Sequence, residues 1–205
     1  MNYGVAYRVG FHPWEDAATH PPFTEKFAEL LDREETGREQ PYGTALDLGT
    51  GSGIWGVELA KRGWQVTGVD NVAKALERAH ERVGDAGVEM HLVEGDVTDL
   101  GASGITPGYR LVLDTGTFHG LGTTQRQAMA QQVDSIAAAD ATVLLIAWEP
   151  KRRGPFPRGA SQGEIEQVFP GWSVTDAGAS NFEAPKPIEL LLRPDEHWYR
   201  LRRRG

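Results

Sequence analysis

The sequence of 205 residues contains no cysteine. Disulfide bonds, thiolate metal ligands and a cysteine nucleophile are therefore excluded, and the absence of disulfides is typical of a cytoplasmic protein. No apolar run approaches the roughly 20 residues that a membrane-spanning helix needs. The start, residues 1–4, also lacks the basic and then apolar pattern of a secretory signal. We therefore expect a cytoplasmic protein without a membrane partner and without a metal site.

Basic residues are in the minority, and the formal net charge is −8. An acidic chain repels phosphate backbones on average, so nucleic acid is not expected as the main partner. Two basic clusters, at 151–153 and 202–204, go against this trend, and we interpret them as surface charges. The composition thus favours a small-molecule partner, and no pattern in the sequence indicates an oligomeric state.

Apolar residues follow strand and helix periodicities in alternation, which predicts an α/β fold with a mostly parallel sheet. There is no internal repeat and no long linker, so we expect a single domain over 1–205, with 1–40 as an N-terminal lid and helix extension. The expected strands are 44–48, 64–69, 88–93, 109–113, 141–148, 172–177 and 197–203. The expected helices are 22–35, 53–62, 72–83, 123–138 and 162–168.

The strongest motif is the glycine-rich turn that follows the first expected strand. The apolar strand ends in Asp47-Leu48, and glycines then alternate at Gly49, Gly51 and Gly53, with Thr50 between the first two. Glycine permits positive φ and puts no side chain between the backbone and a ligand. A small molecule can therefore lie against the main chain at this turn.

The same residues leave an alternative open, because 51–56 also matches the G-x-G-x-x-G fingerprint of dinucleotide-binding turns. Asp47 favours a different ligand. A carboxylate directly before the glycines would face a pyrophosphate unfavourably, whereas it suits the ammonium or sulfonium group of S-adenosylmethionine. A turn that is merely flexible is the third interpretation.

Two further acids follow the second and third strands. Asp70 ends the second strand, where a carboxylate can accept hydrogen bonds from ribose hydroxyls, and Asn71 or Val72 would then lie beside an adenine. Asp96 and Val97 follow the third strand, and an acid next to an apolar residue suits the edge of an adenine. The alternatives are a favourable charge at a helix N-terminus for Asp70 and an ordinary loop acid for Asp96.

Polar groups also follow the fourth strand, as Asp114 and Thr115 and then Phe118 and His119. In an open α/β sheet, ligands bind at the carboxyl ends of the strands. All four elements fall on that edge, and their convergence is stronger evidence than any single motif.

With these motifs, residues 40–150 resemble the class I S-adenosylmethionine-dependent methyltransferases. The resemblance implies a Rossmann-like, doubly wound sheet of seven strands, mostly parallel with one antiparallel strand, and helices on both faces. It also implies that S-adenosylmethionine is the cofactor. The resemblance implies that the methionine part of the cofactor is bound by Asp47, Gly49, Thr50, Gly51 and Gly53. It implies that ribose is bound by Asp70, with Asn71 and Val72 alongside, and that adenine is contacted by Asp96 and Val97. The methionine amino group and the methyl donor would lie near Asp114 and Thr115.

The N-terminal segment narrows the resemblance. Residues 10–15 contain Pro13-Trp14 and look similar to the Pro-Trp-Asp segment of thiopurine- and thiol-methyltransferase-like enzymes, which act on small molecules. In that branch the aromatic residue helps to cover the cofactor, a role that would fall on Trp14. Glu15 replaces the usual Asp, and packing of the N-terminal arm is the alternative role for Trp14.

Methyl transfer is an in-line displacement at a carbon that the sulfonium already activates, so alignment and exclusion of water suffice. A base is needed only for a protonated, weakly acidic acceptor. His119 is the candidate general base by placement, and shaping the pocket is its alternative role. We expect His12, Phe118 and Trp148 on the substrate side.

The stretch 114–117 lacks the Asp/Asn-Pro-Pro-aromatic pattern of amino-methylating DNA enzymes, and methylation at cytosine C5 needs the absent cysteine. Transfer to O, N or S of a small acceptor remains the leading hypothesis. An NAD(P)-dependent oxidoreductase is an alternative, although no Tyr-x-x-x-Lys pair is present. A non-catalytic S-adenosylmethionine-binding protein is another.

Overall fold

The computed structural model describes residues 19–151, 157–182 and 195–204. Their strands form one seven-stranded sheet in the order β3-β2-β1-β4-β5-β7-β6. All pairs from β3 to β5 are parallel, and β7 is antiparallel to both β5 and β6. The predicted seven-stranded, mostly parallel sheet with one antiparallel strand is therefore confirmed. The strands are β1 Thr44–Leu48, β2 Gln65–Asp70, β3 Met90–Glu94, β4 Tyr109–Asp114, β5 Ala137–Trp148, β6 Trp172–Ala179 and β7 Glu196–Arg203.

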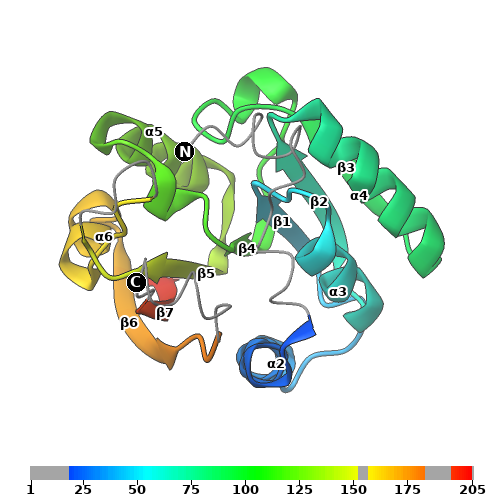
Figure 1. The fold of residues 1–205 in the computed structure, drawn as a ribbon, viewed down its shortest axis with the longest axis horizontal. Coiled ribbons are helices and arrows are strands. Elements are labelled where there is room, and N and C mark those ends of the chain that lie inside the picture. The colour runs from blue at the N-terminus through cyan, green and yellow to red at the C-terminus, as the bar shows by residue number, and fades with distance from the viewer. Residues whose placement is uncertain (1–18, 152–156, 183–194, 205) are drawn as a thin grey trace.

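Helices cover both faces of the sheet (Figure 1). Apolar side chains of α5 and α6 pack with one face in one hydrophobic core, and those of α2 and α3 pack with the other face in a second core. The α4 helix contacts β3 and α3. This arrangement confirms the doubly wound α/β fold. The helices are α2 Pro21–Glu35, α3 Ile54–Arg62, α4 Ala73–Ala86, α5 Thr123–Ile136 and α6 Gln162–Val168.

Local sequence accounts for where most of these elements begin and end. Two prolines occupy the first positions of α2, where their missing N–H groups are not needed. Phe23, Phe27, Leu30 and Leu31 then repeat at helical spacing and are all buried. The α3 helix begins after Gly53 and ends before Gly63, and both glycines have the left-handed conformation. Glycine occupies these two positions because few other residues adopt that conformation.

The start of β5 is a point where the sequence-based expectation was wrong. We expected a helix to 138 and a strand from 141, but α5 ends at Ile136 and β5 begins at Ala137. The Arg203 side chain, far along the chain, donates hydrogen bonds to the carbonyls of Ala137 and Ala138. Such a long-range contact cannot be predicted from the local pattern of apolar residues. Two short 3-10 helices, Gly101–Ser103 and Phe118–Gly120, were also not expected.

A buried carboxylate on α2, that of Glu34, joins this helix to the sheet. Glu34 accepts hydrogen bonds from the Thr142 hydroxyl and the Arg200 guanidinium, each at 2.6 Å. Arg202 also lies 3.7 Å from Glu34, and Arg203 lies 3.0 Å from Asp134. Two members of the 202–204 basic cluster are thus ion-paired, in place of the simple surface charges that we expected.

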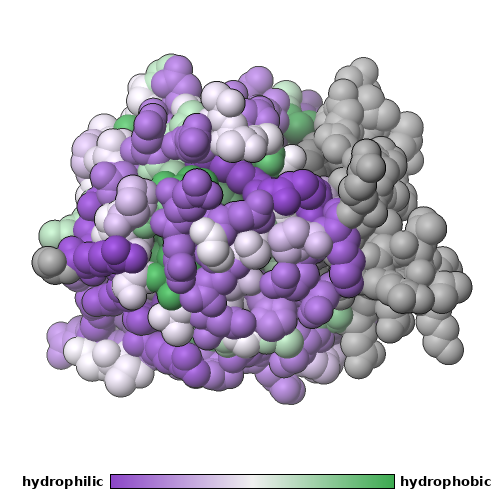
Figure 2. Space-filling view, turned by 90° about the vertical axis from the view of Figure 1, so that its left-hand side faces the viewer, coloured by the Kyte–Doolittle hydropathy of each residue, from purple (hydrophilic) through white to green (hydrophobic). Residues whose placement is uncertain are grey.

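The face over α6 and β6 is mainly hydrophilic, with small scattered apolar areas (Figure 2). The β6 strand at this edge alternates buried Trp172 and Val174 with exposed Ser173 and Thr175, as expected for a strand with one face in water. Within the ranges that the structure describes, no helix has both the length and the apolar character required to cross a bilayer.

Candidate active site

The four polar elements found in the sequence lie along one edge of the sheet. Strands β1 to β5 run parallel, so their carboxyl ends share an edge, with Leu48 beside both Val69 and Asp114, and Asp70 beside Glu94. The loops at 49–53, 71–72, 95–98 and 115–117 leave from that edge. Because β7 is antiparallel, its first residue, Glu196, lies opposite Trp148 at the end of β5.

The glycine turn needs its glycines for two separate reasons. Gly49, Gly51 and Gly53 have φ values of 65°, 56° and 76°, which L side chains rarely adopt. A Cβ on Gly49 would also lie 1.9 Å from the Thr117 hydroxyl oxygen. The turn is therefore locked in shape and packed tightly against the loop after β4.

Asp70 ties this turn to the start of α4. One carboxylate oxygen accepts from the Gly51 N–H at 2.9 Å, and the other accepts from the Val72 N–H at 2.8 Å. Burial raises the pKa of Asp70, while these backbone N–H groups oppose the rise. Asn71 is exposed and Val72 half-buried beside it. The carboxylate lies at the tip of β2, where we predicted ribose binding.

Asp47 points to the α3 side of the sheet and is only 1 % exposed. One of its oxygens accepts from the Thr50 hydroxyl at 2.6 Å. The other has no hydrogen-bond partner among the described residues. Burial raises the pKa of Asp47 to about 7, and the nearby charges of Asp114 and Asp70 add to the rise. The site therefore holds a carboxylate that a nearby positive charge would stabilise.

The raised pKa of Asp47 predicts a pH-dependent loss of stability. Between about pH 4 and about pH 7 the folded state keeps a proton that the unfolded state has released, so the free energy of unfolding falls as pH rises across this interval. Asp47→Asn cannot titrate. We expect wild type to lose stability relative to Asp47→Asn between about pH 4 and about pH 7, measured by urea unfolding without cofactor. Asp96→Asn, at an exposed position, serves as the control. A difference that is constant with pH would refute the assignment.

Asp96 and Val97 lie in different environments. Asp96 is exposed, and one of its oxygens accepts from the N–H and the hydroxyl of Thr98 at 2.8 and 2.7 Å. Val97 is buried in the core. A Cβ on the preceding Gly95 would lie 2.1 Å from the Ser103 hydroxyl oxygen, so this loop is packed against the 3-10 helix at 101–103.

Asp114, which we expected near the methionine end of the cofactor, is buried and bonded to the loop that follows it. It is 0 % exposed, and its two oxygens accept from the backbone N–H groups of Gly116, Thr117 and Phe118 at 2.8–3.0 Å. Burial raises its pKa to about 6, although these N–H groups lower it. Asp114 thus holds the loop in which Thr115 lies half-buried.

Phe118 and His119 form the 3-10 helix after this loop. Phe118 is 0 % exposed and its ring centroid lies 5.9 Å from that of Phe169, so it belongs to the core and not to the acceptor side that we expected. His119 is 5 % exposed. Its Nδ1 accepts from the Trp148 N–H at 3.2 Å, and the two rings lie 5.1 Å apart. Trp148 is half-buried at the end of β5. Our two other candidates, His12 and Trp14, lie outside the described residues.

Three charged residues that we did not predict hold the site together. Arg126 is buried and donates to the carbonyls of Phe118, His119 and Gly159. Arg82 donates to the Ser52 carbonyl in the glycine turn at 2.9 Å. Glu196 accepts from the Trp148 indole N–H at 2.8 Å, and burial raises its pKa. No local sequence pattern identifies these residues, because each forms a hydrogen bond with a residue about 30 or more positions away. Arg126 also forms two hydrogen bonds at shorter separation.

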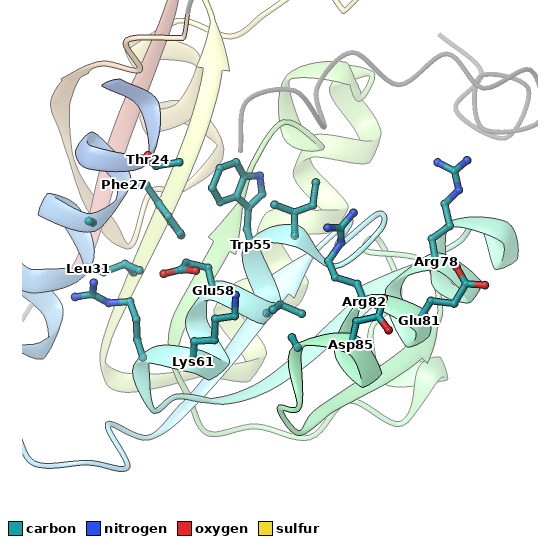
Figure 3. Close-up of a pocket in the computed structure, with 15 residues that line it drawn as sticks. Thr24, Phe27, Leu31, Trp55, Glu58, Lys61, Arg78, Glu81, Arg82 and Asp85 are labelled. Atoms are coloured by element: carbon teal, nitrogen blue, oxygen red, sulfur yellow. The ribbon is translucent and has the colours of Figure 1, made fainter. Parts of the chain in front are cut away.

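A groove of about 740 Å³ lies elsewhere, between α2, α3 and α4. Phe27, Leu31 and Trp55 form its apolar side, and Arg78, Glu81 and Arg82 of α4 its charged side (Figure 3). None of its lining residues belongs to the glycine turn or to the loops after β2, β3 and β4. The groove is therefore separate from the edge where the four motifs meet.

Residues 45–139 match the family described as a methyltransferase domain. A stretch of 79 residues is 34 % identical to the ribosomal RNA small subunit methyltransferase C of Alcanivorax borkumensis, covering 38 % of this chain and 24 % of that protein. A stretch of 84 residues is 38 % identical to the ribosomal protein L11 methyltransferase of Chloroflexus aurantiacus, covering 40 % and 22 %. The chain spans about a quarter of the length of the curated relatives it matches.

Solved structures share the fold at low sequence identity. The N-methyltransferase NodS from Bradyrhizobium japonicum, in complex with S-adenosyl-L-homocysteine, has a TM-score of 0.69 at 16 % identity over 91 % of this chain and 89 % of that chain. An S-adenosylmethionine-dependent methyltransferase from Clostridium acetobutylicum has a TM-score of 0.68 at 11 % identity, covering 90 % and 92 %. A structure concerning the conversion of a disulfide bond into a thioacetal group during echinomycin biosynthesis has a TM-score of 0.65 at 20 % identity, covering 86 % and 81 %.

Proposed function

We propose that this chain is a class I S-adenosylmethionine-dependent methyltransferase that methylates O, N or S of a small-molecule acceptor, because residues 45–139 match a methyltransferase-domain family and the strands have the order β3-β2-β1-β4-β5-β7-β6. The observation that carries the proposal is the hydrogen bond between the Asp70 carboxylate and the Gly51 N–H. It joins the glycine turn and the acid after β2, which are the two strongest sequence motifs, into one rigid feature at the carboxyl edge of the sheet.

The residues at this edge fit S-adenosylmethionine in shape and charge. The left-handed glycines expose the backbone of the turn, the Asp70 carboxylate suits the ribose hydroxyls, and exposed Asp96 suits the adenine amino group. The unpartnered oxygen of buried Asp47 supplies negative charge near the methionine end. The bound cofactor supplies an activated methyl group, and the chain aligns the acceptor and excludes water. Asp114, Arg126 and Arg82 keep the loops in place for that task.

The acceptor proposal rests on charge and on the N-terminal motif. A net charge of −8 disfavours a nucleic-acid acceptor, and Arg200, Arg202 and Arg203 form ion pairs within the chain. The Pro13-Trp14 segment supports the thiopurine- and thiol-methyltransferase-like branch. Sulfur chemistry is also described for one protein of this fold. An RNA or protein acceptor, as the names of the two sequence relatives state for those proteins, is the competing proposal.

Ligand binding tests the cofactor assignment directly. We expect S-adenosylmethionine and S-adenosylhomocysteine to raise the melting temperature, because a ligand that binds the native state stabilises it. NAD and NADP should not. Isothermal titration calorimetry with the same four ligands is the measurement. Stabilisation by NAD without stabilisation by S-adenosylhomocysteine would support the oxidoreductase alternative. Binding without turnover on any acceptor class would support a non-catalytic protein.

A further inference from the structure

Met90 reaches from the edge of the sheet to a small space beside the glycine turn. It is the first residue of β3, the outermost strand on this side, and it is half-buried. A Cβ built on Gly68 of the neighbouring strand β2 would overlap the methyl carbon of Met90. The same Cβ would lie 2.8 Å from the hydroxyl oxygen of Thr50 in the turn. The end of the Met90 side chain and Thr50 therefore meet over Gly68.

Gly56 closes the same space from α3. A Cβ built on Gly56 would also overlap the Met90 methyl carbon, and it would lie 2.8 Å from the Met90 sulfur. It would lie 3.1 Å from Oδ2 of Asp47, the oxygen that accepts from the Thr50 hydroxyl. Gly56 lies inside the helix, so the room that Met90 needs, and not an unusual backbone conformation, requires a glycine here. The last glycine of the G-x-G-x-x-G match at 51–56 thus has a specific packing role.

The thioether of Met90 keeps this space apolar. Asp47 is 1 % exposed, and burial is the main cause of the rise of its pKa to about 7. A water molecule in a buried space needs two or more polar partners, and the Thr50 hydroxyl and the Asp47 carboxylate would supply them. Methionine is flexible and fills irregular gaps well. Met90 therefore occupies a place that water would otherwise take.

We propose that Met90 is a positioning residue of the cofactor site, whose thioether fills the space between Gly56 and Gly68, excludes water from it and holds Thr50 and Asp47 beside the glycine turn. This inference rests on the proposed function, because the ligand of the turn is then S-adenosylmethionine. Met90 acts through Thr50 and Asp47 and does not itself need to touch the cofactor.

Removing the thioether tests the effect on binding. We expect Met90→Ala to weaken S-adenosylhomocysteine binding by about 3- to 30-fold, as is typical of coupling between residues in contact. Met129→Ala is the matched control, because Met129 on α5 is 1 % exposed and packs in the core on the opposite face of the sheet. It should lower the melting temperature and change the affinity by less than about 2-fold. Isothermal titration calorimetry is the measurement, and wild-type affinity in Met90→Ala would overturn the proposal.

A methyl group on Gly56 tests the same space from the other side. In the wild-type background Gly56→Ala should weaken binding, because it overpacks the space. In the Met90→Ala background it should strengthen binding, because the new methyl group falls where the thioether was. Equal losses in both backgrounds would contradict the shared space. If Met90→Ala alone does not fold, the double variant should still bind more tightly than Gly56→Ala, and weaker binding would overturn the proposal.

The titration of Asp47 reports the exclusion of water without any ligand. In ¹³C spectra of the labelled full chain, we expect the midpoint for the Asp47 carboxyl carbon to fall by about 1 pH unit or more in Met90→Ala, because water then reaches the carboxylate. It should not fall in Met129→Ala. The nearest charged groups, Asp70 on β2 and Asp114 on β4, are kept in both variants. The charged residues of α3 line the separate groove: Glu58, Lys61 and Arg62.

The two measurements separate this inference from the function on which it rests. An unchanged Asp47 midpoint in Met90→Ala would show that the thioether does not exclude water. Failure of the wild-type chain to bind S-adenosylhomocysteine would instead contradict the proposed function.

Discussion

Replacing Gly51 by valine is expected to weaken S-adenosylhomocysteine binding by about 100-fold or more. Gly51 has a φ of 56°, a conformation that costs a β-branched residue about 1–3 kcal/mol. Its N–H also donates to Asp70, so a shift of the turn would move the proposed ribose-binding carboxylate. The valine side chain would further separate the backbone from the ligand. Isothermal titration calorimetry on the folded variant measures the loss.

Gly87→Val is the matched control for this variant. Gly87 has a φ of 63° at the C-terminal end of α4, and a Cβ there meets nothing within 4 Å. The control therefore carries similar backbone strain far from the carboxyl edge. We expect it to lower the melting temperature and leave ligand affinity unchanged. Wild-type affinity in Gly51→Val would show that the cofactor does not lie against this turn.

The glycine turn shows what local sequence does predict. The strand over Thr44–Leu48 was predicted with the bounds that the structure has, and the three glycines of the turn all have positive φ. Both features follow from short-range rules, since burial sets the apolar strand and the left-handed conformation requires glycine. The parallel order of the strands then brings the four motifs to one edge. Such strands and turns can therefore be predicted almost entirely from the residue types in the local sequence.

The orientations of the acidic side chains were harder to predict. Asp70 and Asp114 both end inner strands, yet Asp114 turns its carboxylate into its own loop and is fully buried. Asp96 lies in a loop and is exposed. A position at a strand end fixes the edge of the sheet that a residue reaches. It does not fix whether backbone N–H groups or a ligand will satisfy the carboxylate.

Long-range supports were beyond the reach of local patterns. Arg126 joins the 3-10 helix at 118–120 to the Gly159 carbonyl, and Arg82 joins α4 to the glycine turn. Glu196 fixes the Trp148 indole from the neighbouring strand. In the sequence each is an ordinary charged residue of a helix or strand. Only the packing of distant segments turns them into parts of the site.

Asp114→Ala is expected to destabilise the protein by about 3 kcal/mol or more. The Gly116, Thr117 and Phe118 N–H groups would lose their acceptor, and each buried donor left unpaired costs about 1–3 kcal/mol. Part of this cost is offset, because the native state no longer buries a charge, as the rise of the Asp114 pKa to about 6 reflects. Urea unfolding at pH 7 measures the net loss in the free energy of unfolding.

Two further variants separate the loop-holding role of Asp114 from a general effect of losing an acid. Asp114→Asn keeps one carbonyl oxygen for the N–H groups, so its loss should lie between those of wild type and Asp114→Ala. Asp96→Ala removes an acid that accepts two hydrogen bonds from Thr98 at an exposed position, where water replaces the lost acceptor, and it should cost at most about 1 kcal/mol. If Asp114→Ala unfolds at the same urea concentration as Asp96→Ala, the carboxylate does not hold the loop. His119, five residues after Asp114, would then owe its position to other contacts, among them those with Arg126 and Trp148.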